Sequence, residues 1–156
     1  MFTLDIPGFG QVKLMHFVTD FTGTLSVDGQ LMPGVKEGLN KIAKIVKLHV
    51  LTADTFGRAR AELDGVDCEI HILTGENHDI QKEHFVHGLG AATVIALGNG
   101  KNDRLMLKAA RVGIAVCLAE GCAGDAIMAA DLLVMSPLQA IELLLTPNRL
   151  KATLRF

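Results

Sequence analysis

Two short acidic turns, each directly after an apolar segment, carry the residue types with the clearest chemical potential. The first is Asp20-Phe21-Thr22-Gly23-Thr24, and the second, about 80 residues later, is Gly98-Asn99-Gly100-Lys101-Asn102-Asp103. If the apolar segments are parallel strands, the turns meet at the carboxyl edge of the sheet, where reactive groups are held. Carboxylates and oxygen ligands gathered there predict a magnesium-dependent phosphoryl-transfer site.

Taken singly, the candidate residues have ordinary structural explanations. Asp20 could cap a turn through local hydrogen bonds. Thr52, in Leu51-Thr52-Ala53-Asp54, could be a strand-end hydroxyl, and Lys82 a solvated helix residue. Together with Asp103, however, they come near the ends of successive elements, so that each could project toward one edge of the sheet. The combination favours a shared site.

The composition predicts one globular domain over residues 1–156. With 49% hydrophobic and 21% charged residues, disorder is not expected. A formal net charge of −2 gives no electrostatic reason to expect nucleic acid or a membrane surface as a partner. There is no apolar run of transmembrane length and no secretion signal at the start. Three cysteines without metal-type spacing suggest reduced thiols, and hence a cytoplasmic protein.

Short apolar strands alternate with amphipathic helices along the chain, which is typical of an α/β sheet covered on both faces. We expect a three-layer, Rossmann-like, mostly parallel sheet. The expected strands are 2–6 and 12–19, paired as a hairpin across 7–10, and then 48–51, 69–73, 93–97, 112–116 and 132–135. The expected helices are 35–46, 56–63, 79–88, 123–130 and 138–145, with a further helix after the second acidic turn, capped by Asn102 or Asp103.

In this order and context the motifs resemble the haloacid dehalogenase (HAD) superfamily, and most closely the phosphorylation domain of P-type ATPases. There the nucleophile stands in Asp-Lys-Thr-Gly-Thr, matched here from Asp20 with Phe21 in place of Lys. The later Gly-Asp-Gly-x-Asn-Asp signature is matched at 98–103 with Asn99 for the first Asp. The likeness covers about residues 13–145. Membrane helices and the large nucleotide-binding insertion are missing, so the chain resembles a soluble, capless phosphatase-type relative.

The resemblance implies a role for each residue. Asp20 is the nucleophile, which would form an aspartyl-phosphate and also ligate Mg²⁺. The remaining Mg²⁺ ligands would be the Thr22 carbonyl and the side chains of Asn99 and Asp103. Thr52 and Lys82 would hold the phosphoryl oxygens, with further phosphate contacts at Gly23, Ala53 and Asn102. The implied activity is hydrolysis of a small phosphorylated substrate.

Two departures from the family pattern keep an alternative open. Thr22 stands where dedicated phosphatases carry a second aspartate as general acid and base, so about 10²–10⁴-fold of hydrolytic rate could be missing. Asn99 brings no charge, so Mg²⁺ should bind more weakly. The alternative is a catalytically impaired phospho-acceptor or regulatory module. Because a capless site is open, specificity would come from segment 26–33, from loops, or from a neighbouring subunit in a homo-oligomer.

The positions of the histidines in the sequence do not predict a metal site in addition to the magnesium site. His78, His84 and His87 lie on or near one expected helix, but Zn²⁺ would also require a third ligand and supporting hydrogen bonds. A solvated helix face is the expectation for them. His16 and His49 lie in expected strands and are expected to occupy ordinary structural positions.

Overall fold

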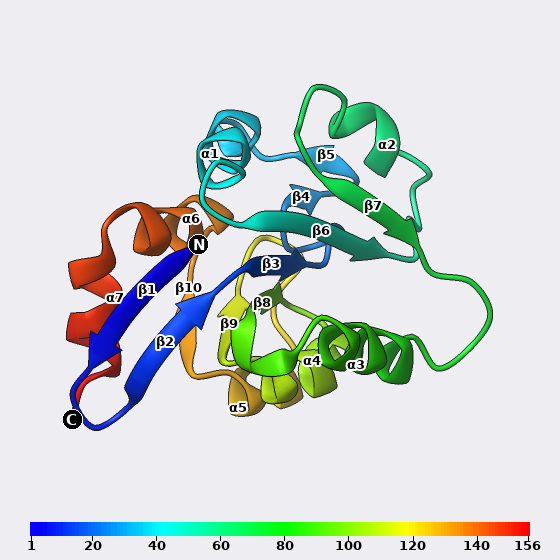
Figure 1. Cartoon of the computed structure of the whole chain (residues 1–156). Coiled ribbons are helices and arrows are strands. Elements are labelled where there is room, and N and C mark those ends of the chain that lie inside the picture. Colours follow the sequence, from blue (N-terminus) through cyan, green and yellow to red (C-terminus); the bar gives the residue numbers. More distant parts are fainter.

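The computed structural model describes residues 1–156 and is organised around a six-stranded sheet in which every neighbouring pair of strands is parallel (Figure 1). From one edge to the other the strands are β10 (Leu132–Val134), β9 (Val112–Val116), β8 (Val94–Gly98), β3 (His16–Thr19), β6 (Lys47–Thr52) and β7 (Glu69–Ile72). The chain winds outward from β3 through β6 to β7 and then returns to the other side of β3. Such a reversal of strand order creates a crevice at the carboxyl ends of the central strands.

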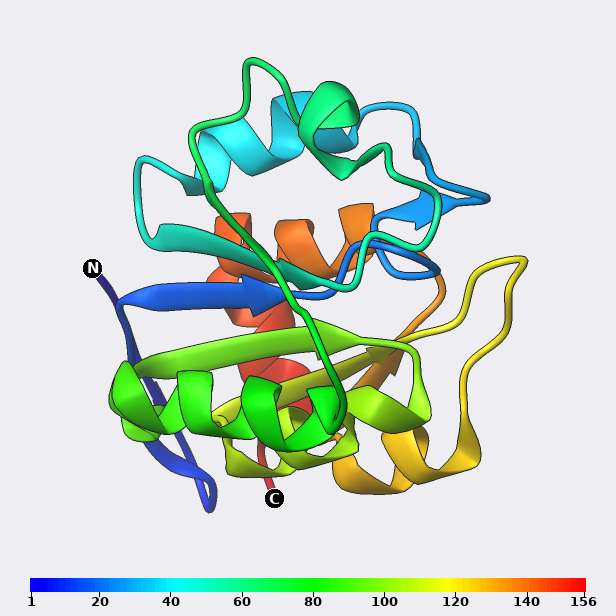
Figure 2. The same cartoon turned by 90° about the vertical axis from the view of Figure 1, so that its right-hand side faces the viewer.

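Helices cover both faces of the sheet, as the sequence predicts (Figure 2). One face packs against α1 (Val35–Ile42), α6 (Pro137–Leu145) and α7 (Pro147–Leu154), and the other against α3 (His78–Gly88), α4 (Arg104–Ala109) and α5 (Gly124–Ala129). Short 3-10 helices occupy Ala91–Thr93 and Lys101–Asp103, and a single helical turn, α2, spans Ala59–Glu62. Strands β8 and β9 are buried along their whole length, which is why both read as continuous apolar runs. No helix is both long and apolar enough to cross a membrane.

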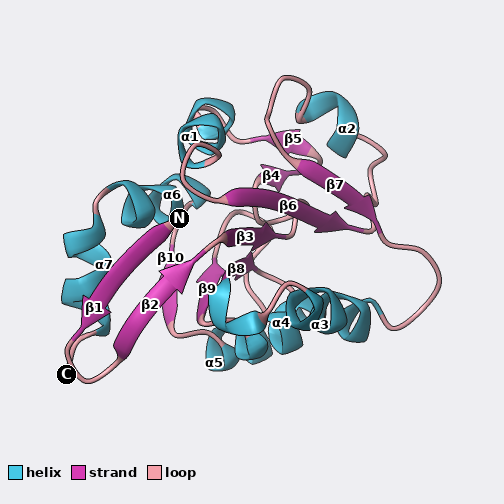
Figure 3. Ribbon diagram, in the orientation of Figure 1, coloured by secondary structure: helices cyan, strands magenta, loops and turns pink.

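Two small hairpins lie outside the main sheet (Figure 3). In the first, β1 (Phe2–Ile6) pairs antiparallel with β2 (Gly10–Leu14); in the second, β4 (Ser26–Val27) pairs with β5 (Gln30–Leu31). The prediction of one continuous strand over 12–19 is wrong, because the chain leaves the first hairpin at Met15 and enters the main sheet as β3. There the Met15 N–H donates to the Thr93 carbonyl, and the Met15 carbonyl accepts from Lys47 N–H.

The helix boundaries also differ from the sequence prediction. Helix α1 ends at Ile42, four residues before the predicted end at 46, and α2 is only one turn of the predicted 56–63 helix. The basic segment near the carboxyl terminus, for which no helix was predicted, forms α7. It begins with Pro147 in the first turn, where the missing N–H costs nothing, and it buries Leu150 and Leu154 on one face.

Gly113 is the residue of β9 that allows close packing of α4. A Cβ built on Gly113 would overlap the Leu107 carbonyl oxygen. We therefore expect Gly113→Ala to lower the free energy of unfolding by about 1–3 kcal/mol, as overpacking does elsewhere. Urea denaturation measures the change. Gly88→Ala, at an open position at the end of α3, is the matched control and should shift stability by less than about 1 kcal/mol. Equal effects would show that β9 and α4 can separate freely.

Candidate active site

The predicted site residues meet at the carboxyl ends of the three central strands. Asp20 directly follows β3, Thr52 is the last residue of β6, and Asn99 directly follows β8. The Asp20 N–H donates to the Leu97 carbonyl at 3.0 Å, which continues the pairing of β3 with β8 one residue beyond the strand. The backbone that carries the carboxylate is therefore held by the sheet.

A small polar pocket of about 210 Å³ opens at this edge. Its lining residues are Asp20, Thr22, Thr52, Ala53, Thr55, Asn99, Gly100 and Asn102. The sequence analysis gave a role to all of these except Thr55, which it did not name, and Gly100, which it named only as part of the second acidic turn. Thr55 lies in the turn after β6 and Gly100 in the second acidic turn, and these positions at strand ends could have indicated both as pocket residues. Gly23, Lys82 and Asp103, which the sequence also predicted, do not line the pocket.

Behind the pocket, one lysine joins two carboxylates. Lys82 Nζ lies 2.6 Å from Asp103 Oδ1 and 3.2 Å from Asp20 Oδ1. The side chain of Lys82 is 1% exposed and that of Asp103 is fully buried, so the solvated-helix explanation for Lys82 does not hold. Lys82 reaches this position from the inner face of α3, one turn before the buried Val86. One positive and two negative charges are thus enclosed together.

The pKa values of the two central groups reflect this balance of charge. Burial raises the pKa of Asp20 to about 7, because the pull of the Lys82 ammonium offsets burial only in part and Asp103 adds repulsion. Burial alone would lower the pKa of Lys82, but the two carboxylates outweigh it and hold that pKa above its ordinary value. Ionisation of Asp20, which lines the pocket, is therefore disfavoured when no cation is bound.

Asp103 holds the second turn in shape. Its Oδ2 accepts hydrogen bonds from the backbone N–H groups of Asn99 at 3.0 Å and Gly100 at 2.9 Å. Asp103 is the N-cap residue of α4, one of the two predicted, but its side chain forms no cap bond at this helix start. Asp103 reaches back to its own turn and to Lys82 instead. Both of its oxygens are engaged behind the pocket wall.

The two acidic turns touch each other through Asn99. The Thr24 hydroxyl donates to Asn99 Oδ1 at 3.0 Å, and Asn99 Nδ2 donates to the Gly121 carbonyl at 3.2 Å. Gly23 has a φ of 76°, and a Cβ there would collide with the Asn99 side chain. Glycine is thus needed at position 23 for backbone conformation and for this close approach.

The same architecture is present in solved structures, although no family model matches the sequence. An uncharacterized protein of Methanocaldococcus jannaschii is 48% identical over 62 residues, which are 40% of this chain and 67% of that protein. A 3-deoxy-D-manno-octulosonate 8-phosphate phosphatase from Moraxella catarrhalis, solved with magnesium and phosphate, superposes with a TM-score of 0.61 at 21% identity, over 89% of this chain and 90% of that one. A HAD-superfamily phosphatase from Bacteroides thetaiotaomicron gives 0.62 at 12% identity, over 90% and 96%.

The chain has the HAD fold. A third similar structure, the cobalt-bound deoxy-D-mannose-octulosonate 8-phosphate phosphatase of Haemophilus influenzae, has a TM-score of 0.60 at 16% identity, over 80% of this chain and 79% of that one. These likenesses confirm the α/β, Rossmann-like architecture expected from the sequence.

The donor atoms of the HAD-fold pocket fit a hard divalent cation. The Asp20 carboxylate and the Asn99 amide both face the pocket, and Thr22 lines it as well. Oxygen donors of this kind suit Mg²⁺, and a cation would neutralise the excess charge on Asp20.

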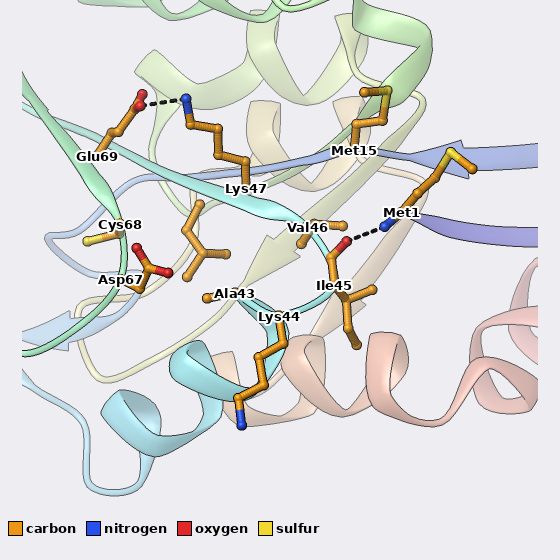
Figure 4. Close-up of a pocket in the computed structure, with 11 residues that line it drawn as sticks. Met1, Met15, Ala43, Lys44, Ile45, Val46, Lys47, Asp67, Cys68 and Glu69 are labelled. Atoms are coloured by element: carbon orange, nitrogen blue, oxygen red, sulfur yellow. Dashed lines mark hydrogen bonds and ion pairs between the residues drawn. The ribbon is translucent and has the colours of Figure 1, made fainter.

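A larger hollow of about 400 Å³ lies at the opposite edge of the HAD-fold sheet (Figure 4). It is lined by Met1, Met15, residues 43–48 and residues 67–69, at the amino ends of β3, β6 and β7. Asp20, Lys82 and Asp103 are all absent from its walls. The smaller polar pocket, which Asp20 lines, is therefore the candidate active site.

The raised pKa of Asp20 has a consequence for stability. A folded-state pKa of about 7, above the ordinary 3.8, means that ionising Asp20 costs folding free energy as the pH rises through this window. Without Mg²⁺, Asp20→Asn should therefore unfold at a higher temperature than wild type at about pH 8.5, and the gain should shrink as the pH falls from about 7 toward 3.8. A gain of a few degrees is expected, since about 1 kcal/mol shifts the midpoint by roughly 2–4 °C.

Thermal unfolding followed by circular dichroism provides the measurement. Asp125→Asn removes an exposed carboxylate that pairs with Lys101 and serves as the matched control. It should show no gain that grows with pH. A pH-independent difference between Asp20→Asn and wild type would contradict the raised pKa.

Proposed function

We propose that this protein is a Mg²⁺-dependent phosphohydrolase that acts through an aspartyl-phosphate, an acyl phosphate formed on Asp20. The observation that carries the proposal is the buried Asp20–Lys82–Asp103 triad directly behind a small polar pocket at the strand-order reversal. The three similar solved structures described above are phosphatases, which supports the same chemistry here.

In the first step a carboxylate oxygen of Asp20 attacks phosphorus in line, and the bond from phosphorus to the leaving oxygen breaks. Lys82 holds Asp20 Oδ1, which fixes the rotation of the carboxylate and places an ammonium directly behind the group that would receive the phosphoryl group. Asp103 in turn fixes Lys82. When bound, Mg²⁺ would supply charge neutralisation between carboxylate and phosphate, and the direct ligands would be Asp20, Thr22 and Asn99. Asp103 would not contact the ion directly, because its two oxygens bind Lys82 and the N–H groups of the second turn. We propose that it supports the ion by holding Lys82 and that turn in place.

Further residues provide the phosphate cradle. The Thr52 hydroxyl oxygen accepts a hydrogen bond from Asp54 N–H at 2.9 Å, so its proton is free to be donated to a phosphoryl oxygen. Ala53 and Asn102 line the same pocket and supply N–H donors. Gly23 contributes by letting the first turn approach Asn99.

Thr22 would make the second step, in which water displaces Asp20 from phosphorus, the slow step of the reaction. A hydroxyl cannot act as a general base near neutral pH, so the aspartyl-phosphate should persist longer than in enzymes with a carboxylate at this position. The same feature supports the alternative of a phospho-acceptor module, in which the adduct itself would be the functional state.

The substrate is proposed to be a small phosphomonoester. The turn that carries Asp20 and Thr22 leads directly into the β4–β5 hairpin. There Asp28 N–H donates to Glu120 Oε2 at 3.2 Å, and Gly29 lies against the Phe56 ring. Sugar-acid phosphates such as 3-deoxy-D-manno-octulosonate 8-phosphate, the substrate named for two of the similar structures, belong first in the panel of compounds to be tested.

Turnover and trapping together test the function. With Mg²⁺ and a panel of phosphomonoesters or acetyl phosphate, wild type should release phosphate slowly and form an acid-stable, hydroxylamine-sensitive adduct. Asp20→Asn should do neither, and Thr22→Asp should release phosphate about tenfold faster or more. A stable adduct without turnover would instead favour the phospho-acceptor module. The absence of both adduct and turnover would overturn both proposals.

The proposed role of Lys82 predicts that Lys82→Ala loses more vanadate affinity than Lys101→Ala. Lys82→Ala should weaken vanadate binding about tenfold or more, because it removes the only ammonium that contacts Asp20. Lys101, whose side chain is 73% exposed and pairs with Asp125, is the control, and Lys101→Ala should change binding less than about twofold. Calorimetry or competition assays measure both affinities.

Removing Lys82 alone leaves two buried carboxylates without a counter-charge and can prevent folding. The double change Lys82→Ala with Asp103→Asn removes one of these carboxylates and keeps the test usable. If folded Lys82 variants bind vanadate as wild type does, the lysine is not part of the cradle.

A further inference from the structure

A second group of chemically capable side chains lies away from the Asp20 pocket. His49 of β6 is the parallel-strand partner of Glu69 in β7, and His71 follows two residues later on the same face of β7. Phe85 of α3 packs against both imidazoles, with ring centroids 5.4 Å from His49 and 4.7 Å from His71. The cluster therefore lies between two strands and the helix that covers them.

The three potential ligand atoms converge. His49 Nδ1 is 3.2 Å and His71 Nε2 is 3.7 Å from the same carboxylate oxygen, Glu69 Oε2, and all three atoms lie within 4.8 Å of one another. A tetrahedral zinc site with bonds of about 2.0–2.1 Å keeps its ligand atoms about 3.3 Å apart. The distances from the Glu69 oxygen to the two histidine nitrogens are already close to this spacing. A modest rotamer adjustment would bring the two nitrogens equally close to each other.

Two buried ring nitrogens in the cluster have no hydrogen-bond partner. They are His49 Nδ1 and His71 Nε2, the same two atoms that point at Glu69. Although Glu69 Oε2 is near both, the 3.2 Å contact of His49 lacks the direction of a hydrogen bond, and the 3.7 Å contact of His71 is too long for one. The side chain of His49 is only 2% exposed, so water does not satisfy it. Unpartnered buried polar atoms are uncommon in folded proteins, and two facing one centre point to an absent ligand.

Neighbouring side chains orient His49 and Glu69 so that His49 Nδ1 and Glu69 Oε2 face the centre of the cluster. His16 Nδ1 lies 3.1 Å from His49 Nε2, so the ring of His49 is held by a partner on its far nitrogen, which leaves Nδ1 to face the centre. Lys47 Nζ binds the other carboxylate oxygen, Glu69 Oε1, at 2.6 Å. Oε2 is thus left for the histidines. The expectation that His16 and His49 occupy ordinary structural positions misses this arrangement.

We propose that His49, Glu69 and His71 form a binding site for one divalent transition-metal ion, with Zn²⁺ preferred. Two imidazoles and one carboxylate suit Zn²⁺, whereas Mg²⁺ prefers oxygen ligands only. Glu69 and His71 are 46% and 37% exposed, which provides access and room for water as a fourth ligand. The bound ion would link the edge strand β7 to its neighbour β6.

The site is separate from the Asp20 pocket. Thr52, which lines that pocket, lies three residues beyond His49, about 10 Å along the strand. Glu69 begins β7 and, with Lys47, lines the hollow at the opposite edge of the sheet (Figure 4). A metal at each place would therefore have its own ligands.

Zinc titration of the whole protein tests the proposal. In excess Mg²⁺, calorimetry should show one Zn²⁺ per chain, and its affinity should fall about 10–100-fold in Glu69→Gln and in His71→Gln. His87→Gln is the matched control, since His87 is an exposed histidine on α3 whose only ionic neighbour is Glu83 at 3.9 Å. It should bind Zn²⁺ as wild type does. Circular dichroism would confirm that each variant is folded.

Two further measurements place the ion. Asp20→Asn should retain the same Zn²⁺ affinity, and Co²⁺ should give a visible absorption band that disappears in His71→Gln. The proposal is overturned if no Zn²⁺ binds in excess Mg²⁺, if Glu69→Gln and His71→Gln bind it as tightly as wild type, or if Asp20→Asn abolishes binding. Neither phosphatase turnover nor adduct formation enters this test, so its result is independent of the proposed function.

Discussion

The enclosure of the Lys82 ammonium by two carboxylates is the interaction on which the site depends. It joins three parts of the fold that are far apart in sequence: α3, the end of β3, and the turn after β8. Buried charges are tolerated only when they are paired and hydrogen-bonded. Any shift of α3 relative to the sheet would separate these charges, so the packing of the helix and the position of the Asp20 carboxylate are coupled.

The remainder of the site is built mainly from backbone. Asp103 binds two N–H groups of its own turn, Thr24 binds Asn99, and the N–H of Asp20 continues the sheet pairing. Because each of these contacts is local to a strand end, the functional side chains inherit the rigidity of the sheet. This arrangement explains how a pocket with so few side chains can be preorganised, as the proposed phosphoryl transfer requires.

The fold class and the meeting of the two acidic turns could be predicted from sequence, because apolar strands and polar strand ends are local patterns. The break at Met15 could not, since it is set by pairing with Thr93 and Lys47 rather than by residue type. The burial of Lys82 also depends on tertiary contacts, and a lysine on a helix is usually exposed.

The histidine cluster was missed for a related reason. His49 and Glu69 are 20 residues apart in sequence and become neighbours only through the register of two parallel strands. A search for metal-type spacing along the chain cannot detect that juxtaposition. The same search directs attention to His78, His84 and His87, which do not form a ligand group in the structure.

The main sheet and the β4–β5 hairpin, which follows the Asp20 turn, are held by contacts of very different extent. The floor beneath the pocket is tied into the six-stranded sheet, whereas the hairpin tip is held by one hydrogen bond to Glu120 and by contact with Phe56. Substitutions at the tip can therefore alter the hairpin without disturbing the backbone that carries Asp20. The surface around the hairpin and the geometry of the Asp20 pocket can change as nearly independent traits.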